Sequence, residues 1–133
     1  MLRRDFAKTA ILGAAAAAAL PAASQAAGMA GDTNIVFSAD NPGHWDKVVA
    51  KHVPKVDVSG STLTVTTPHP QSDAHYIVSH TVVLADGSLL GRKTFTPKDD
   101  PVSTYTLPAG YKGMVKATST CNLHDFWVNT AAV

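Results

Sequence analysis

The sequence predicts an all-β protein, an antiparallel β-sandwich of the immunoglobulin-like type with about seven strands. Short runs rich in Val, Ile, Thr and aromatic residues recur from residue 33 to the C-terminus. Residues that favour turns separate these runs, and only residues 45–51 have the composition of a helical turn or two. About seven strands within roughly 100 residues is the density expected of a sandwich with a single core.

The expected strands follow one another at short intervals along the chain. Their ranges are 34–38, 61–67, 75–84, 88–95, 103–107, 114–121 and 126–129. The intervals contain turn-forming pairs such as Pro42-Gly43, Ser59-Gly60 and Asp86-Gly87. The sequence contains no internal repeat, so we expect one sandwich rather than an array.

The N-terminal residues 1–26 have the features of an export signal. A basic start that includes Arg3 and Arg4 precedes an apolar stretch, 9–20, of about a dozen residues, whereas a membrane span needs roughly 20. We expect cleavage after Ala26, which would leave one domain over residues 27–133. The paired arginines resemble a twin-arginine translocation signal, although Leu2 and Ala7 depart from its usual Ser and Leu. This resemblance implies a periplasmic protein exported in the folded state.

The charge balance excludes some classes of partner. The whole chain has 11 Lys and Arg against 10 acidic residues, and without residues 1–26 the count is 8 against 9. No basic excess remains to bind nucleic acid or an anionic membrane, and we expect neither partner after signal cleavage. All ten acidic residues are Asp, so the chain contains no Glu.

The only cysteine, Cys121, lies in the segment Cys121-Asn122-Leu123-His124. Because it cannot form an internal disulfide, it is a buried filler, a reactive thiol, half of an intermolecular bridge or a metal ligand. An unprotected thiol is easily oxidised outside the cytoplasm, which favours the first and last alternatives. A thiolate and an imidazole three positions apart can reach one metal ion, and His124 therefore favours the ligand.

The other histidines are distributed over the predicted strands and loops. Strict alternation over residues 75–84 predicts that His75 and His80 point to opposite faces and do not share a metal. His69 lies between two prolines and His52 precedes Val53-Pro54, so both lie in stiffened loops that suit metal ligands. His44 and His80 are interpreted as non-ligands.

Five donors in this order resemble the superoxide reductases, the desulfoferrodoxin and neelaredoxin family. The segments that carry the resemblance are Lys51-His52-Val53-Pro54, Pro68-His69-Pro70, His75-Tyr76-Ile77 and Cys121-Asn122-Leu123-His124 with Trp127. The resemblance covers roughly residues 45–127, nearly all of the expected mature domain. Each fragment is weakly specific alone, whereas the ordered set is specific.

The resemblance implies an immunoglobulin-like sandwich with one mononuclear non-haem iron. Its four equatorial imidazoles would be His52, His69, His75 and His124, and its axial thiolate would be Cys121. An additional rubredoxin-like iron site would need four more cysteines, so the chain resembles the class with a single iron centre. The implied activity is the one-electron reduction of superoxide to hydrogen peroxide, with a small redox protein as the external electron donor. The expected partners are superoxide and this donor, and both a single chain and a homo-oligomer stay open.

The resemblance also assigns roles around the open sixth position. Lys51 would lie beside this position and attract the anionic substrate, an effect that should weaken with salt. Many family members have a Glu just before this Lys, whereas this chain has Ala50; we expect water, hydroxide or an added anion to occupy the oxidised iron instead. The second departure is Asp125, where the family usually has Gly, and we expect its side chain to face solvent.

Further expectations concern the residues around the last His. Phe126 and Trp127 are expected to cover the metal loop, and Asn122 to fix it through local hydrogen bonds.

Two alternatives to a reductase stay open from the sequence. One is a cupredoxin-like electron carrier, although no Met follows His124 and two imidazoles would suffice. The other is a non-catalytic binding subunit of the same fold.

Overall fold

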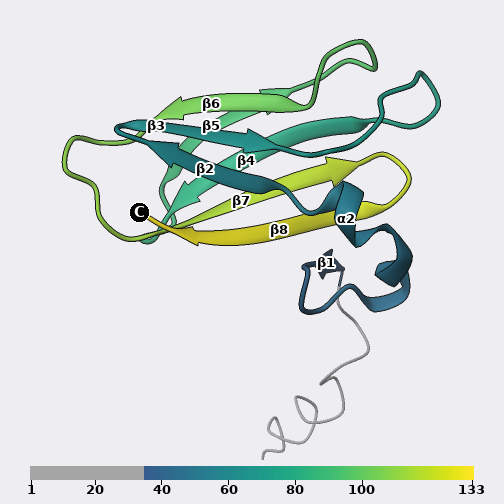
Figure 1. The fold of residues 1–133 in the computed structure, drawn as a ribbon, viewed down its shortest axis with the longest axis horizontal. Helices are drawn as coiled ribbons and strands as arrows, with labels where there is room; N and C mark the ends of the chain where they lie inside the picture. Colours follow the sequence, from purple (N-terminus) through teal and green to yellow (C-terminus); the bar gives the residue numbers. More distant parts are fainter. Residues whose placement is uncertain (1–34) are drawn as a thin grey trace, which may run out of the picture. The chain divides into compact units, whose positions relative to one another are not determined.

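The computed structural model describes residues 35–133, so the predicted signal at 1–26 lies outside the described residues. Within 35–133, eight strands form two sheets, as Figure 1 shows. The predicted all-β class is therefore confirmed. No helix in this range is both long and apolar enough to cross a membrane.

The larger sheet has five strands in the order β1-β8-β7-β4-β5. In that order the strands are β1 (Val36–Phe37), β8 (Asp125–Ala132), β7 (Met114–Cys121), β4 (Ile77–Leu84) and β5 (Leu89–Thr94). All neighbouring pairs are antiparallel except β1 and β8, which are parallel. The predicted antiparallel sandwich is thus confirmed, with one parallel pair added at the edge by the two-residue strand β1.

The smaller sheet has three strands in the order β2-β3-β6. They are β2 (Lys55–Ser59), β3 (Thr62–Thr66) and β6 (Val102–Thr106), and both pairings are antiparallel. The core contains residues from both sheets and the adjoining loops, namely Leu63, Val65, Val82, Leu107, Val115 and Ala117. Burial of these apolar side chains between the sheets is the main force that holds the two layers together.

Strand β2 was not expected from the sequence. Its five residues alternate charged or polar residues with Val56 and Val58, and none of them is fully buried. An edge strand of this kind lacks the apolar face from which strands are recognised. Strand β8 also extends beyond its expected end at residue 129, because its whole length pairs with β7.

Strict alternation fails at the start of β4. Ile77 and His80 are both fully buried although their positions differ by an odd number. The pairing register between β4 and β7 shifts between Ile77 and Ser79, which is the signature of a β-bulge. His75 precedes the strand and forms only an isolated bridge with Ser72. His75 and His80 lie apart as predicted, but period two does not explain it, because a bulge separates His75 from the regular strand.

A short helical connection leads from β1 to β2. A 3₁₀ helix, η1 (Gly43–Val48), is followed directly by one α-helical turn, α2 (Val49–His52). This agrees with the helical turn or two expected at 45–51. Gly43 adopts a φ of 54°, and a Cβ there would meet the Phe37 ring at 2.9 Å. The connection thus fits closely against Phe37, and it ends at His52.

Candidate metal centre

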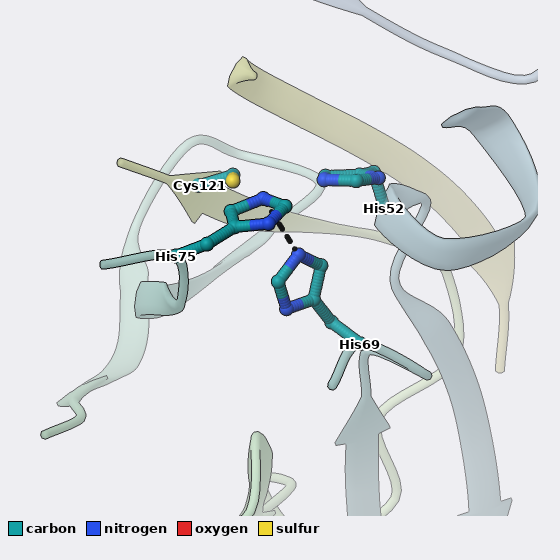
Figure 2. A group of neighbouring side chains, drawn as sticks. All are labelled: His52, His69, His75 and Cys121. Carbon is teal, nitrogen blue, oxygen red and sulfur yellow. Dashed lines mark hydrogen bonds between the residues drawn. The ribbon is translucent and has the colours of Figure 1, made fainter. Parts of the chain in front are cut away.

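The five predicted donors meet at one end of the sandwich. His52 ends α2, His69 follows β3, His75 precedes β4, Cys121 ends β7, and His124 lies in the turn before β8. Ile77 of β4 pairs with Cys121 of β7, so the register brings the His75 loop beside the cysteine. Figure 2 shows His52, His69 and His75 turned toward one another and toward the sulfur of Cys121.

Four imidazole nitrogens form a closed set of neighbours. The Nε2 atoms of His69 and His75 are 3.0 Å apart, and His124 Nδ1 lies 3.0 Å from the Nε2 atoms of both His75 and His52. The four neighbouring rings have centroids 4.4–4.7 Å apart, while His52 and His75 lie across the set at 5.9 Å. The four rings of His52, His69, His75 and His124 therefore form a closed four-sided arrangement, called the square below. The plane of each ring is steeply inclined to the planes of its two neighbours.

The nitrogen atoms are close enough to share a metal ion. Two ligands at about 2.0–2.1 Å from one metal and at right angles to each other are about 3 Å apart, and three of the nitrogen–nitrogen distances are 3.0 Å. The ligand atoms of His52, His69, His75 and Cys121 all lie within 4.8 Å of one another, and the sulfur is 3.7 Å from His124 Nδ1. The sulfur therefore lies within reach of the same ion.

Hydrogen bonds to the outer nitrogens fix the protonation of two rings. His52 Nδ1 lies 2.8 Å from the carbonyl oxygen of Val48, and His69 Nδ1 lies 3.2 Å from Gln71 Oε1. Both partners are acceptors, so each Nδ1 carries the proton and each Nε2 directs a lone pair into the square. Converging lone pairs repel one another unless a cation lies between them. The donor set therefore fits a metal ion.

The pKa values agree with neutral imidazoles. The pKa of His52 is lowered to about 4, chiefly by burial; the Val48 hydrogen bond raises it, and the neighbouring histidines also lower it. Burial also lowers the pKa values of His69 and His75, and the adjacent rings act in the same direction. Neutral imidazole is the form that binds metal, so the cluster is ready to bind near neutral pH.

Cys121 lies on the core side of the square. Its side chain is 3% exposed and packs with Ile77 and Phe95. Burial raises the pKa of this thiol, while backbone N–H groups of Leu123 and His124 lower it. A bound cation would favour the thiolate strongly, and the same N–H groups would then face the sulfur as donors. Because His75 and His124 are only partly buried, the face opposite the sulfur is directed toward the surface.

Asn122 connects the cysteine turn to the loop that carries His75. Its Oδ1 accepts a hydrogen bond from the Tyr76 N–H at 3.0 Å, and its Nδ2 donates to the Ala74 carbonyl at 3.1 Å. The Asn122 N–H also donates to the Tyr76 carbonyl. We expected local bonds within the turn, but these bonds instead join two ligand loops that are far apart in sequence.

Near the site, Trp127 is buried as expected, Phe126 is not, and Gln71 is a neighbour that the sequence did not predict. Trp127 is fully buried and donates from Nε1 to the His124 carbonyl at 2.8 Å, whereas Phe126 is 48% exposed and was wrongly expected to be a cover. Gln71 was missed, because only the folded loop brings its amide oxygen to His69. A Gln two residues after a Pro-flanked His was the only available signal.

The other two histidines lie outside the square. His80 is fully buried between the sheets and bonds to Thr67 and Ser103 hydroxyls at 2.8 Å. His44 is exposed, with Nε2 3.9 Å from Asp125 Oδ2. Lys51 is exposed on α2, directly before His52, and within residues 35–133 no hydrogen bond or ion pair holds its ammonium group.

Comparison with known proteins identifies the family. The family model described as desulfoferrodoxin matches residues 44–130, which is more than half of the chain. The chain belongs to the desulfoferrodoxin family. It is 31% identical over 96 residues to a superoxide reductase of Pyrococcus abyssi, an alignment that covers 59% of this chain and 84% of that protein.

Solved structures of this family have the same fold. A variant of the superoxide reductase (neelaredoxin) from Ignicoccus hospitalis superposes with a TM-score of 0.67 at 26% identity, over 74% of this chain and 93% of that one. The superoxide reductase (1Fe-SOR) from Giardia intestinalis gives 0.56 at 26% identity, over 62% of this chain and 98% of that one. The family match over residues 44–130 includes all five candidate donors.

The two departures from the family pattern have different structural consequences. Ala50 is exposed on α2, and the sequence has no Glu to take its place. Asp125 has a φ of 64°, and its Oδ2 accepts a hydrogen bond from Trp45 Nε1 at 2.9 Å. Asp125 faces solvent as expected, with its side chain 50% exposed, but an indole from the helical connection also reaches its carboxylate.

Proposed function

We propose that this protein is an exported, iron-dependent superoxide reductase that reduces superoxide to hydrogen peroxide with electrons from an external donor. The ligands are the imidazoles of His52, His69, His75 and His124 and the thiolate of Cys121. The observation that carries this proposal is the convergence of four imidazoles, with nitrogen atoms 3.0 Å apart along the set, and one cysteine sulfur at one place. Among the described residues no other cluster has such a donor set.

Different residues hold the metal, close one side of the site and leave the other side accessible. Iron held by this set supplies the single electron that, with two protons, converts superoxide to hydrogen peroxide. The four imidazoles would hold the metal, and Cys121, Ile77 and Phe95 close the core side of the site. The opposite side stays accessible, since His75 and His124 are partly exposed. A small anion can therefore approach only from the surface.

Lys51 attracts the substrate to that open side. Its ammonium group is exposed, lies next to His52 in the chain and has no competing ion-pair partner within residues 35–133. A mobile positive charge near a small site raises the encounter rate with a small anion, and salt screens this effect. Water supplies the protons at such an open position. In the absence of a Glu, we infer that water, hydroxide or an added anion occupies the sixth position after oxidation.

The compartment of the protein is part of the proposal. Residues 1–26 combine paired arginines with a short apolar stretch and small residues near Ala26, a composition that supports export by the twin-arginine route. This route carries folded proteins, so the iron could be inserted before export. A periplasmic superoxide reductase would receive electrons from a small redox protein there.

Metal analysis of the anaerobically purified protein, followed by its oxidised absorption spectrum, tests the proposal. We expect about one iron per chain and a visible sulfur-to-iron charge-transfer band, lost in Cys121→Ser. Stopped-flow mixing with superoxide should show second-order oxidation of the reduced protein. Protein that binds no iron, or an unchanged band in Cys121→Ser, would refute the assignment.

The cupredoxin-like alternative is not favoured by the site. Blue copper needs two imidazoles and one thiolate, whereas this cluster presents four imidazole nitrogens at the corners of one square. An intense blue band on addition of copper, with iron rejected, would reverse this conclusion. A non-catalytic subunit is also disfavoured, because the complete donor set and the accessible face are both present.

A further inference from the structure

The connection ahead of His52 folds over the turn that carries His124. A continuous series of ring contacts runs from Trp127 to Phe37 at 5.7 Å, from Phe37 to His44 at 5.2 Å and from His44 to Trp45 at 4.4 Å. The series ends where the Trp45 ring stands nearly perpendicular to the His124 ring, with centroids 4.6 Å apart. A residue from outside the donor set therefore touches one of the four imidazoles directly.

A hydrogen bond holds Trp45 in this position. Its Nε1 donates to Asp125 Oδ2 at 2.9 Å, and His44 Nε2 lies 3.9 Å from the same oxygen. An indole N–H bonded to a carboxylate is a charge-assisted hydrogen bond, which is stronger than one between neutral groups. Asp125 thus anchors the connection to the turn between β7 and β8.

The backbone of Asp125 indicates that this contact matters. Asp125 is the one non-glycine residue with a positive φ, 64°, among the described residues. Asp and Asn tolerate the left-handed region better than most residues, but glycine occupies it with no strain. A strained position that carries a side chain with a specific partner is a reason to look for a role.

We propose that Asp125 is a positioning residue of the metal centre: its carboxylate holds the Trp45 indole against the His124 imidazole and fixes the connection that ends in Lys51 and His52. This inference rests on the proposed function for its effect on the metal. The contact itself does not depend on it. His124 is fixed from two sides, because Trp127 Nε1 holds its carbonyl while Trp45 holds its ring.

The carboxylate also acts through its charge. Asp125 pairs with Cys121 in the register between β7 and β8, so its negative charge lies close to the sulfur. A fixed negative charge beside a metal stabilises the more positive oxidised state and lowers the reduction potential. Asp125→Asn keeps an acceptor oxygen and tolerates the backbone conformation, yet it removes the charge. The holding and electrostatic effects can thus be separated.

Hydrogen exchange of the metal-free full chain tests the holding role. Asp125→Gly removes the backbone strain of the positive φ and also the carboxylate acceptor. Trp45→Phe keeps an aromatic ring but removes the Nε1 donor. In both, we expect amides of residues 43–52 to exchange about tenfold faster, because a hydrogen bond to a charged group is lost. The two changes combined should add little, because they remove the same bond. Asp125→Asn keeps a neutral acceptor, so its exchange should be closer to that of the wild type than to that of Asp125→Gly.

The matched control is Asp46→Asn, which removes the same charge from the exposed residue next to Trp45 without touching the indole bond. It should leave exchange unchanged. Unaltered protection of residues 43–52 in Asp125→Gly would overturn the proposal. So would an equal loss of protection in Asp46→Asn, since net charge alone would then explain the result.

The reduction potential of the iron-loaded protein tests the link to the metal. We expect a higher potential in both Asp125→Asn and Asp125→Gly, and a shifted charge-transfer band in Asp125→Gly alone. An unchanged potential and band in Asp125→Gly, despite faster exchange, would make Asp125 a purely structural residue and overturn the positioning role. Wild-type protein that binds no iron would instead refute the proposed function, and the exchange experiment would still decide whether Asp125 holds the connection.

Discussion

Single residues decide which nitrogen each imidazole offers to the centre. His52 and His69 present Nε2 because Val48 and Gln71 occupy their Nδ1 atoms. His124 presents Nδ1, since its position in the tight turn brings the near side of its ring to the square. A ligand set is therefore defined by the partners of its rings as much as by the histidines themselves.

Gln71→Ala should lower metal affinity about 10–100-fold, because the His69 ring then loses the acceptor that fixes its tautomer and orientation. The same oxygen accepts the Ile77 N–H at 2.8 Å, so the loop before β4 loosens as well. Chelator competition with Co²⁺ or Zn²⁺ measures the affinity. Gln71→Glu retains an acceptor oxygen and should bind much more tightly than Gln71→Ala; equal affinities in all three proteins would contradict this account.

Lys51→Ala should slow the reaction with superoxide about tenfold at low salt and flatten its salt dependence, because the steering charge is removed. Iron content and the charge-transfer band should not change, since Lys51 is exposed and its ammonium group forms no hydrogen bond or ion pair within residues 35–133. Pulse radiolysis at several ionic strengths measures the rate. Lys55→Ala, an exposed lysine on β2, is the matched control, and an equal effect there would remove Lys51 from the mechanism.

At the scale of elements, strand ends and not strand interiors build the site. The end of β7 supplies Cys121, the turn into β8 supplies His124, and the bulged start of β4 places His75 ahead of the regular strand. The bulge allows Ile77 to pack beneath the sulfur while His80 still faces the core further along. Rigid pairing thus holds loops whose own conformations carry the ligands.

Contact between the sheets can be tested far from the ligand loops. A Cβ at Gly91 of β5 would lie 2.5 Å from the Tyr105 ring of β6, so Gly91→Ala should lower the free energy of unfolding by about 1–3 kcal/mol. Denaturant titration measures this change, and the spectrum of the centre should persist. In a Tyr105→Ala background the added methyl should have little effect. A similar loss in that background would show that the clash is not the cause.

At the scale of the whole molecule, a buried polar network joins the two sheets. Thr67 Oγ1 donates to Ser119 Oγ and lies 2.8 Å from His80 Nε2, while His80 Nδ1 lies 2.8 Å from Ser103 Oγ. All four side chains are nearly inaccessible. Because every ring nitrogen of His80 has a partner, the histidine is tolerated in the core as a neutral group.

This network predicts a dependence of stability on pH. Burial, and secondarily the charge of Lys93, lower the pKa of His80 from 6.5 to about 4. Between these values the unfolded chain binds a proton that the folded chain does not, so stability falls as the pH falls from about 6.5 to about 4. The loss due to His80 should approach about 3 kcal/mol.

Denaturant unfolding of the metal-free protein at pH 7 and pH 4 measures this dependence. His80→Gln cannot titrate, so its stability should fall less over the same range by about that amount. The ligand histidines also titrate, but they do so in both proteins and cancel in the comparison. Parallel curves for the two proteins would show that His80 is not the group responsible.

The sequence by itself determined the fold class, most strand positions and the five candidate donors, because alternating apolar runs and the ordered His and Cys segments are local features. It could not reveal β2, whose exposed edge has no apolar pattern, or the β4 bulge, which only pairing with β7 produces.

Only the tertiary structure decided how these residues meet. The nitrogen square, Gln71 on His69, Asn122 between two loops and the Trp45–Asp125 bond all join residues whose contact depends on how the loops and sheets are placed. Sequence spacing constrains a side chain relative to its own strand or helix. Distances between elements are set by packing and register, which no local pattern encodes.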